Sequence, residues 1–244
     1  MKILPVGSLL LLAACSNEPA AQREQATPRV LPSVIKPQPP AGPAPALPVK
    51  PPAVKGRFAP RDECASVPGA AEFRRALANA VRMRDVSAMA GLADPAIKLD
   101  FGGGSGLATL RERLAGDGGK QLWAELDSIL ALGCALQHDN LVLPWLFAQD
   151  LGAIDPFSAM IVTGNDVPVR ASATSDASVT ATLSWTAVEL VGGLQPDAAF
   201  QHIRVPGGQA GYIATSALRS PIDYRIIANQ KNGEWKIGAF IAGD

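Results

Sequence analysis

Three cysteines are the residues of this 244-residue chain with the most informative chemistry, and they stand far apart in the sequence. Cys15 follows an apolar stretch near the start, whereas Cys64 and Cys134 lie in the later part of mixed composition. A thiol can act as a nucleophile, bind a metal ion or form a disulfide, and the compartment and the neighbouring groups decide which. The residues that precede Cys15 indicate the compartment.

Residues 1–14 have the layout of a secretory signal peptide. Lys2 is followed by the apolar run 3–12 and then by small residues. This run is shorter than the roughly 20 residues that span a bilayer. Residues 12–15 (LAAC) fill the four positions of a lipobox, so the segment resembles a bacterial lipoprotein signal. The alternative is an ordinary cleaved signal, with which Cys15 is lost.

The lipoprotein resemblance implies that Cys15 is lipidated and becomes the first mature residue. Because Ser16 rather than Asp follows it, the resemblance also implies an anchor in the outer membrane, on the periplasmic face. Residues 15–60 contain more than half of the chain's 21 prolines and carry more Lys and Arg than Glu. Such a composition predicts a disordered, extended spacer, with a PxxP-type ligand for a partner as the lesser alternative. The acidic remainder of the chain argues against nucleic-acid binding.

Cys64 and Cys134 form an even pair in what we expect to be an oxidising compartment, so we predict a disulfide between them. The alternative is two separately buried thiols. Cys134 lies near the predicted end of a helix, where the helix dipole disfavours a thiolate nucleophile. The chain has only two histidines, and neither they nor the cysteines show metal-ligand spacing.

Carboxylates are the remaining groups that could do chemistry. Asp94 with Asp100, or Asp150 with Asp155, could be paired, but spacing alone does not distinguish a glycosidase pair from solvated loop residues. The glycines of FGGGSG lack the Gly-Lys-Ser/Thr ending of a phosphate loop and predict a strand-to-helix turn instead. We therefore expect a protein that is not an enzyme and that has no metal or cofactor.

Residues 61–157 have mainly helical periodicity, with apolar residues at 73, 77, 80 and 81 on one face. In this region the sequence predicts a single strand, with Ile97, Leu99 and Phe101 on its buried face and the preceding helix stopped by Asp94-Pro95. Short β-type runs divided by turn residues follow from about residue 158.

Residues 162–221 resemble bacterial SH3-type (SH3b) domains. The segments that carry the resemblance are VPVR at 167–170, ASVTATL at 177–183, IRV at 203–205 and GYI at 211–213, with Leu218 at the close. The resemblance implies a small β-barrel that binds peptide, with Arg170, Trp185 and Tyr212 as speculative ligand-binding residues. Tyr212 could equally belong to the barrel core, and Arg170 could simply face solvent. Trp185 stands where the family usually has a turn residue, so the family's ligand preference does not carry over.

Residues 222–244 predict a β-hairpin around Asn232-Gly233, with Trp235, Ile237, Ala239 and Ile241 alternating on one face. A lone hairpin is marginal in water, and the helical region lacks a sheet. We therefore predict an α+β fold. An N-terminal helical segment (61–157) is completed by this C-terminal hairpin (222–244), and an SH3-like barrel (158–221) is inserted between them.

The arrangement of the chain also resembles SH3-domain proteins of alphaproteobacteria, a resemblance that implies no activity. Two functions remain open. The first is a non-catalytic envelope lipoprotein whose SH3-type module binds wall peptide or an envelope protein. The second is a periplasmic structural or assembly factor that holds a protein or a small apolar ligand through its α+β domain.

We predict that Cys15→Ala blocks lipidation, because the modification uses the thiol of that residue. Fatty-acid labelling in cells should be lost, and the chain should remain uncleaved or be released from membranes. Cys64→Ala, which leaves Cys15 in place, is the control and should still be labelled. Undiminished labelling of the Cys15→Ala chain would overturn the lipoprotein interpretation.

Overall fold

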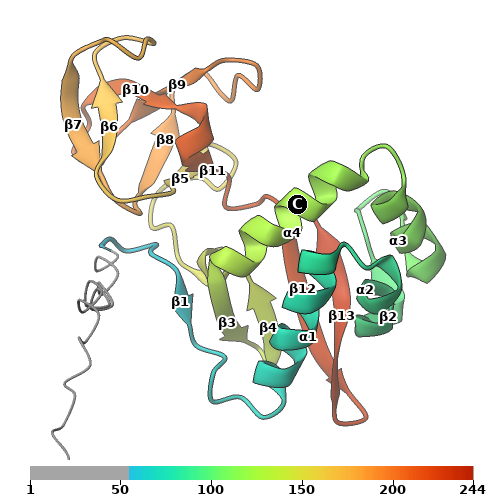
Figure 1. The fold of residues 1–244 in the computed structure, drawn as a ribbon. Coiled ribbons are helices and arrows are strands. Elements are labelled where there is room, and N and C mark those ends of the chain that lie inside the picture. Colours follow the sequence, from blue (N-terminus) through green and yellow to red (C-terminus); the bar gives the residue numbers. More distant parts are fainter. Residues whose placement is uncertain (1–54, 244) are drawn as a thin grey trace, which may run out of the picture. The chain divides into compact units, whose positions relative to one another are not determined.

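The computed structural model describes residues 55–243, which form an α+β fold with two sheets and, within that range, four α-helices (Figure 1). The predicted α+β class is therefore confirmed. Cys15, the leader and most of the proline-rich arm lie outside the described residues. Within residues 55–243 no helix is long and apolar enough to cross a membrane.

The first sheet combines strands from the two ends of the described region. Its order is β1-β3-β4-β12-β13-β2. Neighbouring strands are antiparallel except at β1–β3 and β13–β2, which are parallel. The hairpin of β12 and β13 thus lies between β4 on one side and β2 on the other. The strand bounds are β1 Arg61–Asp62, β2 Ala93–Lys98, β3 Gly133–Gln137, β4 Asn140–Leu143, β12 Arg225–Lys231 and β13 Glu234–Ile241.

Four helices contribute the apolar side chains that pack on this sheet. They are α1 (Ala70–Met83), α2 (Val86–Leu92), α3 (Gly106–Ala115) and α4 (Gly119–Ala131). Figure 1 shows α1 and α4 crossing in front of the strands. The main core joins these helices to the sheet, and its members include Phe73, Leu77, Leu110, Leu126, Ile226, Ile237 and Phe240. Burial of each large side chain contributes roughly 1.5–3 kcal/mol.

A β-bulge in β13 corrects the predicted face of the hairpin. Ala228 pairs with Ile237 and Ile227 pairs with Ala239, so Gly238 is the extra residue. The insertion reverses the alternation of side chains beyond it. Phe240, rather than Ile241, therefore joins Trp235 and Ile237 in the main core. The expectation of one uninterrupted apolar face was wrong for this reason.

The predicted strand at Ile97 is displaced towards the N-terminus. β2 begins at Ala93, immediately after α2, so Asp94 and Pro95 belong to the strand rather than to a helix stop. A proline is tolerated here because β2 is an edge strand. Phe101 is 60% exposed instead of buried. The chain turns before it, since the Leu99 N–H donates to the Gly104 carbonyl at 2.8 Å and places Phe101 in the loop.

The hairpin of β3 and β4 was not predicted from the sequence. Cys134 lies in β3, not near the end of a helix, because α4 ends at Ala131. The turn residues His138 and Asp139 both have positive φ, 49° and 61°, as a two-residue hairpin turn requires. Histidine and aspartate are among the few non-glycine residues that adopt this conformation, but the pair is a weaker sequence signal than Asn-Gly. The helical region therefore contributes four strands rather than one.

The second sheet has seven strands in the order β11-β5-β8-β9-β10-β6-β7, with β11 and β7 at its two ends. No pairing joins these two end strands within the described range, so hydrogen bonds do not close the sheet into a barrel. Its core contains Val162, Val169, Val188, Ile203 and Ile213. The strands are β5 Ala159–Val162, β6 Val167–Arg170, β7 Val179–Leu183, β8 Ala187–Leu190, β9 Phe200–Arg204, β10 Ala210–Ala214 and β11 Leu218–Arg219.

Both sheets belong to one compact unit of the chain and contact each other at two places. A small apolar cluster includes Leu132 and Ala135 from the first region and Ile161 and Ala187 from the second. Arg219 of β11 is 8% exposed and donates to Glu125 of α4 at 3.0 Å. These contacts attach the seven-stranded sheet to the end of α4 and to β3.

We predict that deletion of residues 223–244 unfolds residues 62–155, because it removes β12 and β13 and their core side chains. Amide exchange, measured segment by segment, should show lost protection in α1 and α4 and retained protection in β5–β10. Deletion of residues 243–244 alone keeps both strands and is the control. Helices that stay protected in the longer truncation would contradict the prediction.

Candidate functional site

The two cysteines of the folded region lie together at the distance of a disulfide. Their Cα atoms are 5.8 Å apart, and both side chains are fully buried in the main core. The parallel pairing of β1 with β3 brings them together, since Asp62 is in register with Cys134 and the Glu63 N–H donates to the Cys134 carbonyl at 2.9 Å. A buried, bonded pair offers no sulfur to a substrate or a metal ion, so this site is structural.

Arg170 and Tyr212 lie side by side on the seven-stranded sheet, although they are far apart in sequence. Tyr212 of β10 is in register with Arg170 of β6 and, on its other side, with His202 of β9. The Tyr212 and His202 rings are stacked, with centroids 4.7 Å apart and planes 16° from parallel. All three side chains are partly exposed. We call these three residues the Arg–Tyr–His row.

The alternation of the strands puts this row on the outer face of the sheet. In β9 the buried residues Gln201 and Ile203 flank His202, and in β10 the buried residues Gly211 and Ile213 flank Tyr212. The Val169 side chain packs directly over Gly211, which has no side chain of its own. A Cβ atom on Gly211 would collide with Val169. Tyr212 therefore lies on the face opposite the core. It is not a core residue, which was the alternative that the sequence left open.

Arg170 is oriented by the loop that follows it. Its Nη1 atom donates to the Ala177 carbonyl at 2.7 Å, which holds the guanidinium at the edge of the β6–β7 connection. A guanidinium has five N–H donors, so further donors remain for a ligand. The alternation of Gln-His-Ile places His202 on the surface of a strand, but the sequence did not indicate it as a ligand-binding residue. Only the register of β9 against β10 shows that it meets Tyr212.

Trp185, the third predicted ligand-binding residue, lies elsewhere. Its side chain is partly buried against the apolar cluster at the junction of the two sheets. Its carbonyl accepts a hydrogen bond from the Phe58 N–H at 2.9 Å, and its φ of 42° marks a turn. The structure therefore brings Arg170 and Tyr212 together and assigns Trp185 a packing role at the junction.

The aspartates considered as a catalytic pair have separate partners. Asp94 pairs with Lys231, and this contact, together with the Ala96 N–H, lowers the pKa of the Asp94 carboxyl. Asp100 pairs with Arg113, and this contact, with the Gly104 N–H, lowers the pKa of the Asp100 carboxyl. A general acid at neutral pH needs a raised pKa, so the shifts are opposite to that role.

Asp150 and Asp155 each accept a hydrogen bond from a backbone N–H two residues further along, that of Gly152 and that of Phe157. These bonds are typical of turn residues. Within the part of the chain that the structure describes, no group of three or more His, Cys, Asp and Glu side chains is arranged to hold a metal ion.

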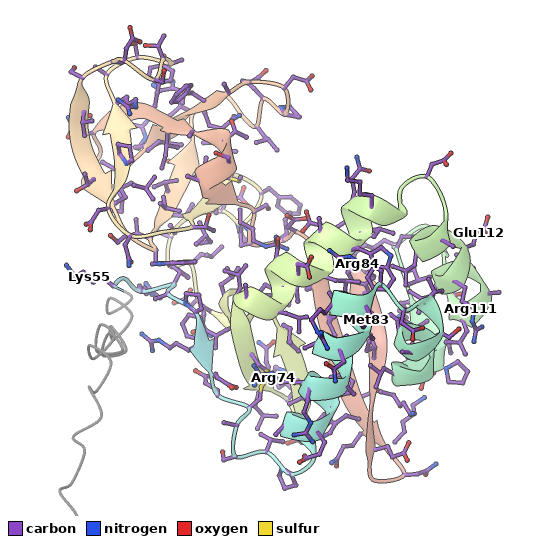
Figure 2. The ribbon with its side chains drawn as sticks, in the orientation of Figure 1. Lys55, Arg74, Met83, Arg84, Arg111 and Glu112 are labelled. Carbon is purple, nitrogen blue, oxygen red and sulfur yellow. A yellow bond between two sulfur atoms is a disulfide. The ribbon has the colours of Figure 1, made fainter. Side chains whose placement is uncertain are left out.

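A cleft of about 720 Å³ lies between α3 and α4. Its lining combines polar side chains, among them Thr109, Glu112, Asp117, Gln121 and Glu125, with Leu122 and Tyr224. Figure 2 labels Glu112 on α3 beside Arg111. A second cleft of about 380 Å³ shares Glu125 and reaches Thr163 and Ser216 of the seven-stranded region.

Comparisons of the chain with known protein families, with curated proteins and with solved structures found no match.

We predict that Cys64 and Cys134 are bonded to each other in the mature protein. In a chain that begins at Ser16, thiol counting after denaturation without reductant should find no free cysteine. The double variant Cys64→Ala/Cys134→Ala should lose roughly 4 kcal/mol of unfolding free energy, the chain-entropy value for a loop of about 70 residues. Two alkylated thiols in the denatured, unreduced chain would contradict the prediction.

Proposed function

We propose that this protein is a non-catalytic lipoprotein of the cell envelope whose residues 158–221 form an SH3-type module that binds wall peptide or an envelope protein. The single observation that carries the proposal is the Arg–Tyr–His row. It places a cation, a phenol and an imidazole on three adjacent strands, outside the core and in register. The lipid anchor at Cys15, on the periplasmic face of the outer membrane, supplies the location.

The SH3-type assignment is supported by where its motif residues lie. Residues 167–170 coincide with β6, and Gly211-Tyr212-Ile213 lies within β10, next to it in the sheet. Leu218 begins β11, directly after a short 3₁₀ turn at Thr215–Ala217. Because the first sheet contains strands from both before and after this module, the module is inserted within the α+β domain.

The chemistry of the row suits an extended peptide that carries a carboxylate. Arginine binds carboxylates through paired N–H donors, and Arg170 keeps donors beyond the one used for Ala177. The stacked rings of Tyr212 and His202 give a flat surface on which a peptide backbone or an apolar side chain can lie. Wall stem peptides are extended and contain free carboxylates, which meets both requirements.

A sedimentation assay with purified wall sacculi tests the proposal. Arg170→Ala and Tyr212→Ala should each weaken binding about tenfold or more, the effect expected where a binding contact is lost. Arg204→Ala is the matched control, because Arg204 lies on the same sheet but pairs with Glu189 at 3.6 Å. The native chain should also bind an isolated stem peptide with a carboxylate more tightly than its amidated form.

Equal binding by the Arg170→Ala, Tyr212→Ala and Arg204→Ala chains would overturn the assignment of the row. Absence of binding to sacculi, together with capture of one envelope protein by the native chain alone, would transfer the ligand from wall peptide to protein. Folding of each variant is checked by its melting temperature, since all three side chains are partly or fully exposed.

A structural or assembly role through the α+β domain is the second candidate, and the cleft between α3 and α4 favours it. Its lining combines charged and polar side chains with Leu122 and Tyr224, which suits a segment of a partner protein. A photo-crosslinking residue at Gln121, in this cleft, is compared with one at Tyr212. A partner captured from Gln121 but not from Tyr212 would support the second role.

A further inference from the structure

The outer face of the seven-stranded sheet presents one more side chain beside the Arg–Tyr–His row. Arg170 of β6 is in register with Val179 of β7 as well as with Tyr212 of β10. A β-bulge with Thr180 as its extra residue leaves Val179 on the same face as Arg170. Val179 is 52% exposed. A single exposed valine is common on protein surfaces, but this one faces, across the strand pair, a guanidinium that keeps donors for a ligand.

The width of this surface sets the length of peptide that it can contact. Val179, Arg170, Tyr212 and His202 lie on the four successive strands β7, β6, β10 and β9. Neighbouring strands are about 4.8 Å apart, so the surface measures roughly 14 Å across. An extended peptide advances about 3.4 Å per residue, and the surface therefore accommodates about four residues. When the terminal carboxylate lies at Arg170, the preceding residues cross the two rings and the last side chain lies beside Val179.

The carboxylate of Asp176 limits what the last residue of such a peptide can carry. Asp176 is exposed in the β6–β7 loop, one residue before the Ala177 carbonyl to which Arg170 donates at 2.7 Å. A hydrogen bond from the Thr174 side chain and, more weakly, the charge of Arg170 lower the pKa of the Asp176 carboxyl, so it is ionised at neutral pH. Asp176 therefore repels a second carboxylate on a ligand that already places one at Arg170.

We propose that Val179 and Asp176 determine the specificity of the Arg–Tyr–His row, which takes a peptide whose last residue has one free carboxylate and an aliphatic side chain. This inference rests on the proposed peptide-binding function and names the end of the peptide that is bound. Arg170 binds the terminal carboxylate, Val179 contacts the aliphatic side chain, and Asp176 disfavours an acidic last residue. The stacked rings of Tyr212 and His202 contact the residues before it.

The two selective contacts respond differently to ionic strength. Repulsion between exposed charges reaches about 10 Å at 0.1 M salt but only about 3 Å at 1 M, so salt removes the effect of Asp176. Contact between aliphatic groups does not depend on charge and persists at both concentrations. Salt therefore separates the contribution of Asp176 from that of Val179 without any substitution.

Titration calorimetry of the chain from Ser16 onward with three synthetic wall-type stem tetrapeptides tests the proposal. The peptides differ only in the last residue, which is glycine, valine or glutamate with a free terminal carboxylate. The native chain should bind the valine peptide about threefold or more tighter than the glycine peptide, the effect of one partly buried aliphatic group. It should bind the glutamate peptide about threefold or more weaker than the glycine peptide at low salt, and this difference should disappear near 1 M salt.

Two single substitutions separate the contacts. Val179→Ala should remove the preference for valine over glycine and leave the glutamate difference unchanged. Asp176→Asn should remove the glutamate difference and leave the preference for valine unchanged. Val191→Ala and Asp197→Asn are the matched controls. Val191 lies at the opposite end of the row, where its N–H donates to the His202 carbonyl at 2.9 Å, and Asp197 is exposed in the β8–β9 loop.

The outcomes separate this inference from the proposed function. Equal affinity of the native chain for all three peptides, or the same change in a variant and its matched control, would overturn the specificity assignment and leave peptide binding in place. Sacculi that bind while none of the three peptides does would also overturn it, because the row would then recognise another part of the wall. Absence of binding to peptides and sacculi alike would remove wall binding as well.

Discussion

The pairing of β12 and β13 between β4 and β2 is the constraint on which the rest of the structure depends. The helices bury their apolar faces on a sheet in which β12 and β13, two of the interior strands, come from the far end of the chain. Trp235 illustrates the dependence, because its indole N–H donates to the Pro68 carbonyl at 2.9 Å, just before α1 begins. The pair of Asp94 and Lys231 connects the same distant segments, whereas the disulfide of Cys64 and Cys134 joins two segments within residues 61–157. The seven-stranded sheet attaches to this framework, and a separate apolar core holds its own strands together.

The sequence predicts what periodicity and turn chemistry encode locally. The α+β class follows from the helical repeat at Phe73 and Leu77 and from alternating runs later in the chain. Asn232 and Gly233 have φ of 52° and 84°, which is the conformation that the Asn-Gly pair favours in a two-residue turn. The close approach of Cys64 and Cys134 followed from counting cysteines in an expected oxidising compartment. Each of these features is visible within a short window or in composition.

The features that were missed depend on register or on competing turns. The bulge at Gly238 changes which of Phe240 and Ile241 faces the helices, and alternation alone gives no sign of it. The turn at His138 and Asp139 competes with helix continuation, and only the strand pairing decides between them. The candidate site was half predicted for the same reason. Arg170 and Tyr212 were predicted from their residue types alone. The strand order places His202 beside them and places Trp185 elsewhere.

The order of strands in the first sheet also determines when the chain can fold as it is made. Synthesis proceeds from the N-terminus, so the ribosome completes all four helices and the whole of the second sheet before it adds Arg225. A nascent chain of that length has every helix and strands β1 to β4 but lacks β12 and β13, so the apolar helical faces are only partly covered. The intervening module, whose contacts are nearer in sequence, can form first. The helical region therefore cannot complete its fold until β12 and β13 are synthesised. A chain whose synthesis stops earlier exposes apolar surface to chaperones and proteases.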